Sequence, residues 1–221
     1  TNVTYWDRID KVDVLFWSGF RGGPAERLCE GCGAPTDVSP DGKKILFEPL
    51  RAPEDVMMLD ISSGERIHLV HGAKRPLYGG RFSPDARWVA FHTTVDQSAN
   101  RQIFIVPVRD GRTSYESEWI QITDGSKVEG DAYWSPDGML LYFLSERDGF
   151  RCIWAQRLNR ARKHPVDPPF AVEHFHHARL SLKRLGRWGG AIGLSVAQDK
   201  LVIAVGELTG NVWFTQLMPD R

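Results

Sequence analysis

Two cysteines are the first residues whose type and spacing could do chemistry. Cys29 and Cys32 have the C-x-x-C spacing found in metal sites and in redox-active thiol pairs. A second ligand pair, which a structural zinc site needs, is missing from the sequence, and no helix start beside a βαβ unit is indicated at this motif. Its place in the chain favours a plain connection between repeats, and a local disulfide or a metal site are the alternatives.

Two histidines form the second candidate. His174 and His176 alternate along a strand predicted over residues 170–175, so their side chains would share one face. Imidazoles bind zinc or copper readily. Because no carboxylate or cysteine accompanies them at a telling spacing, we expect an ordinary edge strand here, with no metal and no other cofactor.

Catalytic motifs are missing from the rest of the sequence. It has no Walker loop and no dinucleotide-binding glycine pattern, and residues 193–197 lack the closing glycine of a nucleophile elbow. We therefore expect a protein that is not an enzyme.

The composition narrows the classes of partner. The 221 residues contain 28 Lys plus Arg and 28 Asp plus Glu, so the net charge is zero. No overall positive potential therefore attracts the chain to nucleic acid. No apolar run approaches the ~20 residues that cross a bilayer, so we expect no membrane insertion. A protein, a peptide or a small molecule remains as the partner.

A repeated segment organises the chain. Ser-Pro-Asp followed by Gly or Ala recurs between apolar runs, and Pro, Asp and Gly each favour a tight turn. The β-branched and aromatic residues that follow are too few for a core helix, so each copy reads as strand, turn, strand. The copies occupy residues 38–47, 82–91 and 134–143, with a degenerate fourth at 194–205.

A further apolar run follows each copy at a similar offset and predicts a third strand. These runs begin at Val56, Ile103, Ile153 and Val212, and weaker fourth strands follow the first three. The turn serines lie 44, 52 and 60 residues apart, which is about the length of a four-stranded propeller blade. Stacking such sheets around an axis buries both faces of each one.

The repeats resemble those of the TolB-like, WD-repeat-like β-propellers, whose blades carry an aromatic-Ser-Pro-Asp-Gly turn before an apolar strand. The resemblance covers roughly residues 35–217 and implies an all-β propeller of about four to five four-stranded antiparallel blades. It also implies protein–protein contact, often in the bacterial envelope or in a sensor protein, and it alone indicates a periplasmic or other extracytoplasmic location.

The predicted blades divide one propeller domain. Residues 1–34 form a partial blade with third and fourth strands, followed by blades at 35–72, 73–125 and 126–178. Residues 179–221 form the last blade with a preceding insertion. Since the two ends do not make one clean blade, we expect a piece of a larger ring.

First strands line the channel of a propeller, which places Asp37, Arg81, Asp131 and Tyr133 beside it. Variable loops gather on the face opposite the Ser-Pro-Asp-Gly turns and would carry His92 and Arg147. These six residues are the predicted ligand-binding residues.

The leading functional hypothesis is a non-enzymatic module that binds a protein or peptide through this top face and the channel mouth. The alternative is an accessory propeller that gates a peptidase-type hydrolase domain outside this chain. A propeller lyase or glycosidase would need clustered carboxylates or a metal in the channel, where Asp37 and Asp131 are the candidates.

Overall fold

The computed structural model describes residues 2–50, 55–72, 75–95, 98–109, 111–176, 180–182 and 194–207. Within these ranges the chain is almost entirely β, and its one helical element is a 3-10 turn at Glu116–Glu118. None of the described residues form a helix of the length and apolarity that crossing a bilayer requires. The predicted third strand at Val212 lies outside the described residues.

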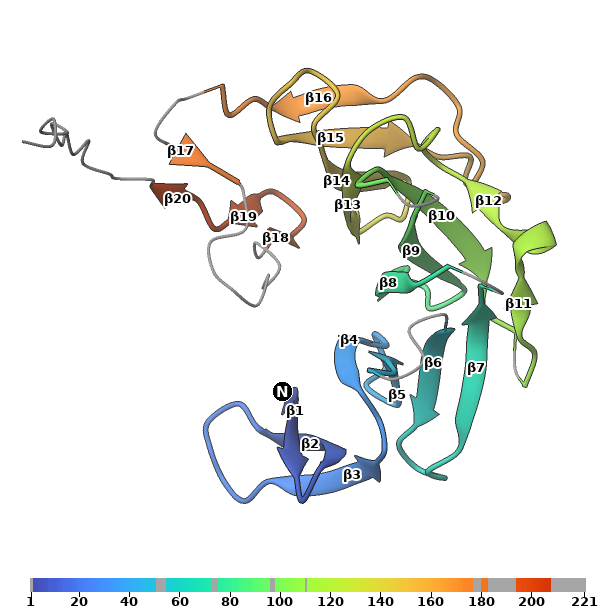
Figure 1. The fold of residues 1–221 in the computed structure, drawn as a ribbon, viewed down its shortest axis with the longest axis vertical. Helices are drawn as coiled ribbons and strands as arrows, with labels where there is room; N and C mark the ends of the chain where they lie inside the picture. The colour runs from blue at the N-terminus through green and yellow to red at the C-terminus, as the bar shows by residue number, and fades with distance from the viewer. Residues whose placement is uncertain are drawn as a thin grey trace, which may run out of the picture.

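Antiparallel sheets follow one another along the chain and are arranged in an arc (Figure 1). The first contains β1 (Asn2–Ile9), β2 (Val12–Gly19) and β3 (Glu26–Glu30). The second contains β4 (Ala34–Val38), β5 (Lys44–Glu48), β6 (Asp55–Asp60) and β7 (Arg66–His71). The third contains β8 (Leu77–Phe82), β9 (Trp88–Thr94), β10 (Arg101–Pro107) and β12 (Ile120–Gln121). The fourth contains β13 (Glu129–Trp134), β14 (Leu140–Ser145), β15 (Cys152–Arg157) and β16 (Phe170–Glu173).

Shorter strands complete the described structure. β11 (Ser114–Tyr115) pairs in parallel with β7, so a segment that follows the third sheet's long strands extends the second sheet. Two strand pairs follow the fourth sheet, β17 (Leu180–Ser181) with β20 (Gly206–Glu207) and β18 (Leu194–Val196) with β19 (Leu201–Ile203). The all-β class and the four-stranded antiparallel sheets agree with the sequence analysis, whereas the exact blade boundaries stay a prediction.

The first sheet has one strand more than the sequence predicted. β1 pairs with β2 at every position from Asn2–Gly19 to Ile9–Val12, and Tyr5 stacks on Phe16 with ring centroids 5.3 Å apart. The two-residue turn between them, Asp10-Lys11, has φ of 49° and 68°. This left-handed conformation normally selects Asn-Gly or Asp-Gly, and the missing glycine hid the hairpin.

The Ser-Pro-Asp segments form the predicted hairpin corners. In the copy at Ser135, the hydroxyl donates to Asp137 Oδ1 at 2.6 Å and accepts from the Leu140 N–H at 2.8 Å. Ser39 and Ser83 make the same pair of bonds in their own corners. The hydrogen bond from Ser135 lowers the pKa of Asp137 below its ordinary value. Each corner is therefore closed by its own polar side chains rather than by the core.

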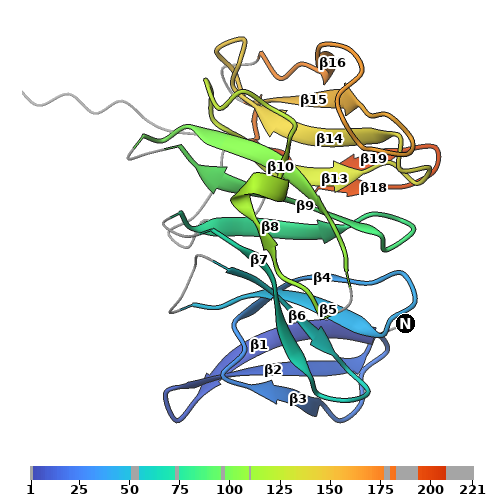
Figure 2. The ribbon, with the colours of Figure 1, turned by 90° about the vertical axis from the view of Figure 1, so that its right-hand side faces the viewer.

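The core lies between the sheets, which Figure 2 shows stacked one beside the next. Ile45 and Phe47 of β5 pack toward the first sheet, while Leu46 between them packs toward the third. Further clusters join the third sheet to the fourth and the fourth to Leu182 and Leu194. Both faces of the inner sheets are thus buried against neighbours, as in a propeller.

Two of the Ser-Pro-Asp corners carry different residues at the same left-handed position, so opposite substitutions can test the cost of that conformation. Ala86 has φ of 55°, whereas Gly42 at the equivalent position has φ of 72° and open space where a Cβ would lie. A left-handed residue with a Cβ costs about 1 kcal/mol relative to glycine. Ala86→Gly should stabilise the protein and Gly42→Ala should destabilise it, each by about 1 kcal/mol in urea denaturation. Two shifts of the same sign would contradict this account of the corners.

Candidate functional site

The predicted channel residues of three neighbouring sheets meet one another. Asp37 of β4 accepts a hydrogen bond at Oδ2 from the Phe82 N–H of β8, at 2.8 Å. Arg81 of β8 donates to the Tyr133 hydroxyl of β13 at 3.3 Å, and its guanidinium lies 4.9 Å from the centre of that ring. The Trp134 indole N–H donates to the Arg81 carbonyl at 3.1 Å. We call this chain of contacts between β4, β8 and β13 the inner clasp.

Burial shapes the chemistry of the inner clasp. Desolvation raises the pKa of Asp37, although the charge of Arg81 and the Phe82 N–H act in the opposite direction. Its carboxyl is engaged by the backbone of the next sheet. This contact joins the second sheet to the third.

A backbone bulge recurs in each of these inner strands. The strand register shifts between Pro35 and Asp37, between Tyr78 and Arg81, and between Gly130 and Tyr133. Bulges redirect side chains. Asp131, in the third bulge, is buried and has φ of 52°, a left-handed value that Asp tolerates better than most residues.

His92 lies elsewhere than predicted. Expected on a loop of the top face, it is within β9 and only 2% exposed. A Cβ on Gly79 would approach its ring to 3.1 Å and one on Gly130 to 3.3 Å. The imidazole therefore fills the space that two glycines of adjacent inner strands leave open. β9 extends three residues beyond the predicted end at Phe91, which places His92 within the sheet.

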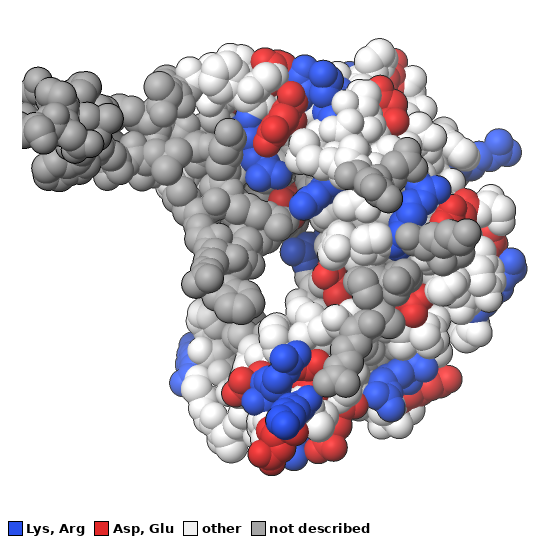
Figure 3. Space-filling model, viewed as in Figure 1, with Lys and Arg blue, Asp and Glu red and all other residues white. Residues whose placement is uncertain are grey.

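A cavity of about 440 Å³ opens beside the inner clasp. Its lining includes Asp37, Arg81 and Tyr133 together with the corner prolines Pro40, Pro84 and Pro136. This cavity lies on the side of the Ser-Pro-Asp corners, opposite the face where the sequence analysis expected function. Figure 3 shows acidic and basic side chains interspersed over the described part of the face in view, with neither charge dominating.

A second cavity, of about 460 Å³, lies between the third and fourth sheets. Arg147, a predicted site residue, lines it together with Glu129, which sequence reasoning missed. Glu129 begins β13 and is 1% exposed, and its Oε1 accepts from the Ser145 hydroxyl at 2.9 Å and from Arg147. Among the described residues, no donor reaches its Oε2. The sequence signal that could have pointed to Glu129 is an acidic residue at the start of an inner strand.

Aromatic rings hold Arg147 in place. Its guanidinium lies 4.8 Å from the Trp154 ring centre and 5.5 Å from that of Phe143, and its Nε lies 3.2 Å from the Ser145 hydroxyl. Stacking and hydrogen bonding together fix the side chain while part of it stays exposed. Arg147, which the sequence analysis expected on a loop of the top face, is therefore the ion-pair partner of the buried Glu129.

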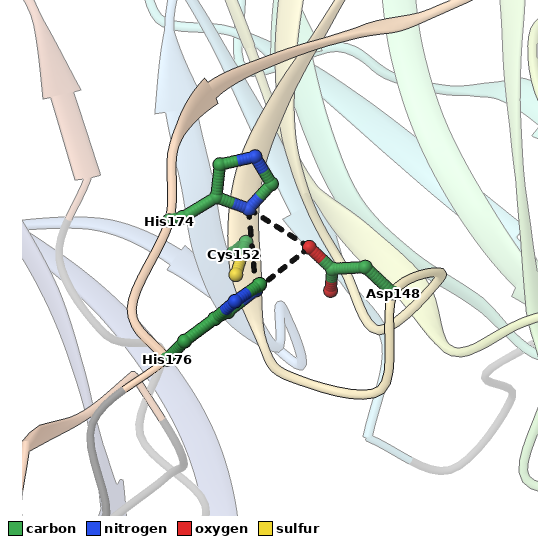
Figure 4. Close-up of side chains that lie close together, drawn as sticks. All are labelled: Asp148, Cys152, His174 and His176. Atoms are coloured by element: carbon green, nitrogen blue, oxygen red, sulfur yellow. Dashed lines mark hydrogen bonds and ion pairs between the residues drawn. The ribbon is translucent and has the colours of Figure 1, made fainter.

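The two histidines of the sequence analysis do have a carboxylate and a cysteine beside them. Asp148, in the turn after β14, and Cys152, at the start of β15, meet His174 and His176 just beyond β16 (Figure 4). Asp148 Oδ2 lies 2.9 Å from both His174 Nδ1 and His176 Nε2, and these nitrogens lie 3.2 Å apart. The four ligand atoms all lie within 4.8 Å of one another. The expectation of an ordinary edge strand fails here because β16 ends at Glu173 and the histidines turn toward the preceding hairpin.

Electrostatics differ between the two acidic groups of this cluster. Burial by itself would raise the pKa of Asp148, but hydrogen bonding and charge from His176 bring it below the ordinary value. Burial raises the pKa of the Cys152 thiol, and the nearby Asp148 charge adds to the rise. Trp154 and Phe150 pack against the His174 and His176 rings and restrict their rotation.

Cys29 and Cys32 form a disulfide, one of the three alternatives that the sequence left open. The loop it closes connects β3 to β4, and Cys32 packs in the core between the first and second sheets. Arg66 of β7 donates to the Glu30 carbonyl at 3.0 Å, which ties the same loop to the second sheet.

The Glu129–Arg147 pair gives a prediction for stability. Removing the cation from a buried pair leaves an uncompensated charge, so Arg147→Ala should cost about 3 to 5 kcal/mol. Glu129→Gln should cost less, because Arg147 reaches solvent. The double variant should be more stable than Arg147→Ala alone, as measured by urea denaturation of all four proteins. Strictly additive losses would show that the two groups do not depend on each other.

Comparison with known proteins adds to this geometry. No protein-family model matches the sequence. The chain is 34% identical over 108 residues to the uncharacterized protein Atu1656 of Agrobacterium fabrum, covering 48% of this chain and 34% of that relative. The chain thus spans about a third of the length of the curated relative it matches.

Solved structures share the architecture at low identity. TolB from Acinetobacter baumannii has a TM-score of 0.63 and 16% identity, over 93% of this chain and 50% of that one. A putative TolB from Agrobacterium tumefaciens has a TM-score of 0.58 and 20% identity, over 77% and 62%. A prolyl endopeptidase has a TM-score of 0.57 and 16% identity, over 92% of this chain and 31% of that one. Together with the sheets packed face to face around the inner clasp, these likenesses show that the chain has the fold of a TolB-like β-propeller.

Proposed function

We propose that this chain is a non-enzymatic interaction module that binds a protein or peptide segment in the groove between its third and fourth sheets. The groove is the 460 Å³ cavity lined by Glu129 and Arg147. The TolB-like resemblance implies protein–protein contact and supports a role of this class.

One observation carries the proposal: among the described residues, no donor reaches the buried Oε2 atom of Glu129. A buried carboxylate oxygen without a protein donor costs free energy, and a water, an ion or a ligand donor can satisfy it. The groove offers further polar groups on exposed residues, including Asp124, Ser126 and Lys127. Because Glu129 is only 1% exposed, a ligand N–H or ammonium group reaches its Oε2 once the side chains above it move aside, and a peptide provides both kinds of donor.

The proposal is tested with peptides selected by the wild-type chain from a random phage-displayed library. Their affinities are then measured by isothermal titration calorimetry. Glu129→Gln keeps the shape of the side chain but places an NH₂ group or a neutral oxygen at Oε2, so affinity should fall about tenfold or more. Glu65→Gln makes the same chemical change on an exposed turn of the opposite face and should leave affinity within about twofold.

A second variant tests the groove without touching the buried pair. Ser126→Trp fills the groove from an exposed position and should abolish peptide binding while leaving the denaturation midpoint near wild type. Selected peptides that bind both groove variants as tightly as the wild type would place the interaction surface elsewhere and refute the proposal.

The second candidate function is an accessory propeller of a peptidase. The likeness to a prolyl endopeptidase, of which the chain spans 31%, favours it. The sequence of the complete coding region distinguishes the two functions. An adjoining α/β-hydrolase domain would support the accessory propeller, whereas an adjoining regulatory domain would support the interaction module.

A further inference from the structure

We propose that Asp148, Cys152, His174 and His176 bind one divalent transition-metal ion, with Zn²⁺ as the best match to the ligand set. The cluster joins the turn after β14, the start of β15 and the residues that follow β16. It is separate from the groove proposed above to bind peptide, and either proposal can fail without the other.

The distances between ligand atoms are those of a small coordination sphere. Zn²⁺ binds nitrogen and oxygen at about 2.0 to 2.2 Å, so two ligand atoms on a tetrahedron around it lie about 3.3 to 3.6 Å apart, slightly farther than the ligand atoms here. Here Asp148 Oδ2, His174 Nδ1 and His176 Nε2 form a triangle with sides of 2.9, 2.9 and 3.2 Å. The Cys152 sulfur lies within 4.8 Å of all three atoms.

Hydrogen bonds alone account for this triangle only if both imidazoles carry a proton on the nitrogen that faces Asp148 Oδ2. Each ring nitrogen carries at most one proton. Two N–H groups then converge on one oxygen, with their nitrogens only 3.2 Å apart. If one nitrogen is not protonated, its contact with Oδ2 brings two lone pairs together at 2.9 Å. A cation among the three atoms satisfies all of them at once.

A second histidine pair in the same chain shows the contrast. Asp55 also accepts from two histidines, but His68 Nδ1 contacts Oδ2 at 2.9 Å and His71 Nδ1 contacts Oδ1 at 2.6 Å. Each imidazole there has an oxygen of its own, so ordinary hydrogen bonds satisfy the group. In the proposed metal site both imidazoles converge on one oxygen, with a thiol beside them.

The chemical mixture of ligands indicates the metal. Thiolate and imidazole favour zinc over magnesium or calcium, and imidazole, thiolate and carboxylate are all ligand types that tetrahedral zinc accepts. Carboxylate and thiolate together balance the charge of a divalent ion. The Phe175 N–H already points to the Cys152 sulfur at 3.3 Å, as a donor to a thiolate would.

Solvent access is compatible with loading. The side chains of His174 and His176 are 46% and 44% exposed, whereas Cys152 is fully buried beneath them. An ion can reach the imidazoles from solvent and bind the sulfur below. Bound metal would then fasten the turn after β14 to the outer strand of the fourth sheet.

The experiment is a titration of the full chain, kept reduced, with Co²⁺ followed by competition with Zn²⁺. We expect one ion per chain, the visible bands of tetrahedral Co²⁺ and a thiolate-to-cobalt charge-transfer band. His174→Ala with His176→Ala should weaken Co²⁺ binding at least about 100-fold. His68→Ala with His71→Ala, the matched control, should leave it within about twofold of wild type.

Cysteine variants identify the sulfur ligand. The charge-transfer band should disappear in Cys152→Ser and persist in Cys29→Ser with Cys32→Ser, and near-wild-type circular dichroism of each variant checks the fold. Less than about 0.2 ion per reduced chain would overturn the proposal. The proposal would also be overturned if the double variant of His174 and His176 bound Co²⁺ as tightly as the wild type. The same holds if the charge-transfer band disappeared in the double variant of Cys29 and Cys32 and persisted in Cys152→Ser.

Discussion

Face-to-face burial of small sheets is the constraint on which the rest of this structure depends. A four-stranded sheet has too little area to bury its apolar residues on itself, so both faces need a neighbour. Successive residues of β5 meet this need by packing alternately on the sheet before and the sheet after. Every other feature, from the polar corners to the proposed sites, lies at an edge or a seam of this stack.

The seams hold polar chemistry because apolar packing stops there. At the inner strands, repeated bulges turn backbone and side-chain groups toward the next sheet, and the inner clasp links β4, β8 and β13 through Asp37, Arg81 and Tyr133. At the opposite end of β13, Glu129 and Arg147 occupy a seam between the third and fourth sheets. Polar groups that join sheets and polar groups available to a ligand thus have the same structural origin.

Much of the fold follows from local sequence, because the repeated corner is a local structure. Ser, Pro and Asp close each corner with bonds among neighbours, so the strands on either side could be predicted. β1 could not, since its turn at Asp10-Lys11 adopts left-handed backbone without glycine.

The sites were predictable only in part. Asp37, Arg81 and Tyr133 were placed together because inner strands of a propeller face one axis. His174 and His176 were visible as a pair, but Asp148 and Cys152 reach them through the pairing of β15 with β16, a contact that spacing along the chain does not reveal. His92 lies between Gly79 of its own sheet and Gly130 of the next sheet, which also has a consequence for substitution. Any larger residue at either glycine would contact the imidazole, so the junction of the third and fourth sheets limits the side chains that both can carry.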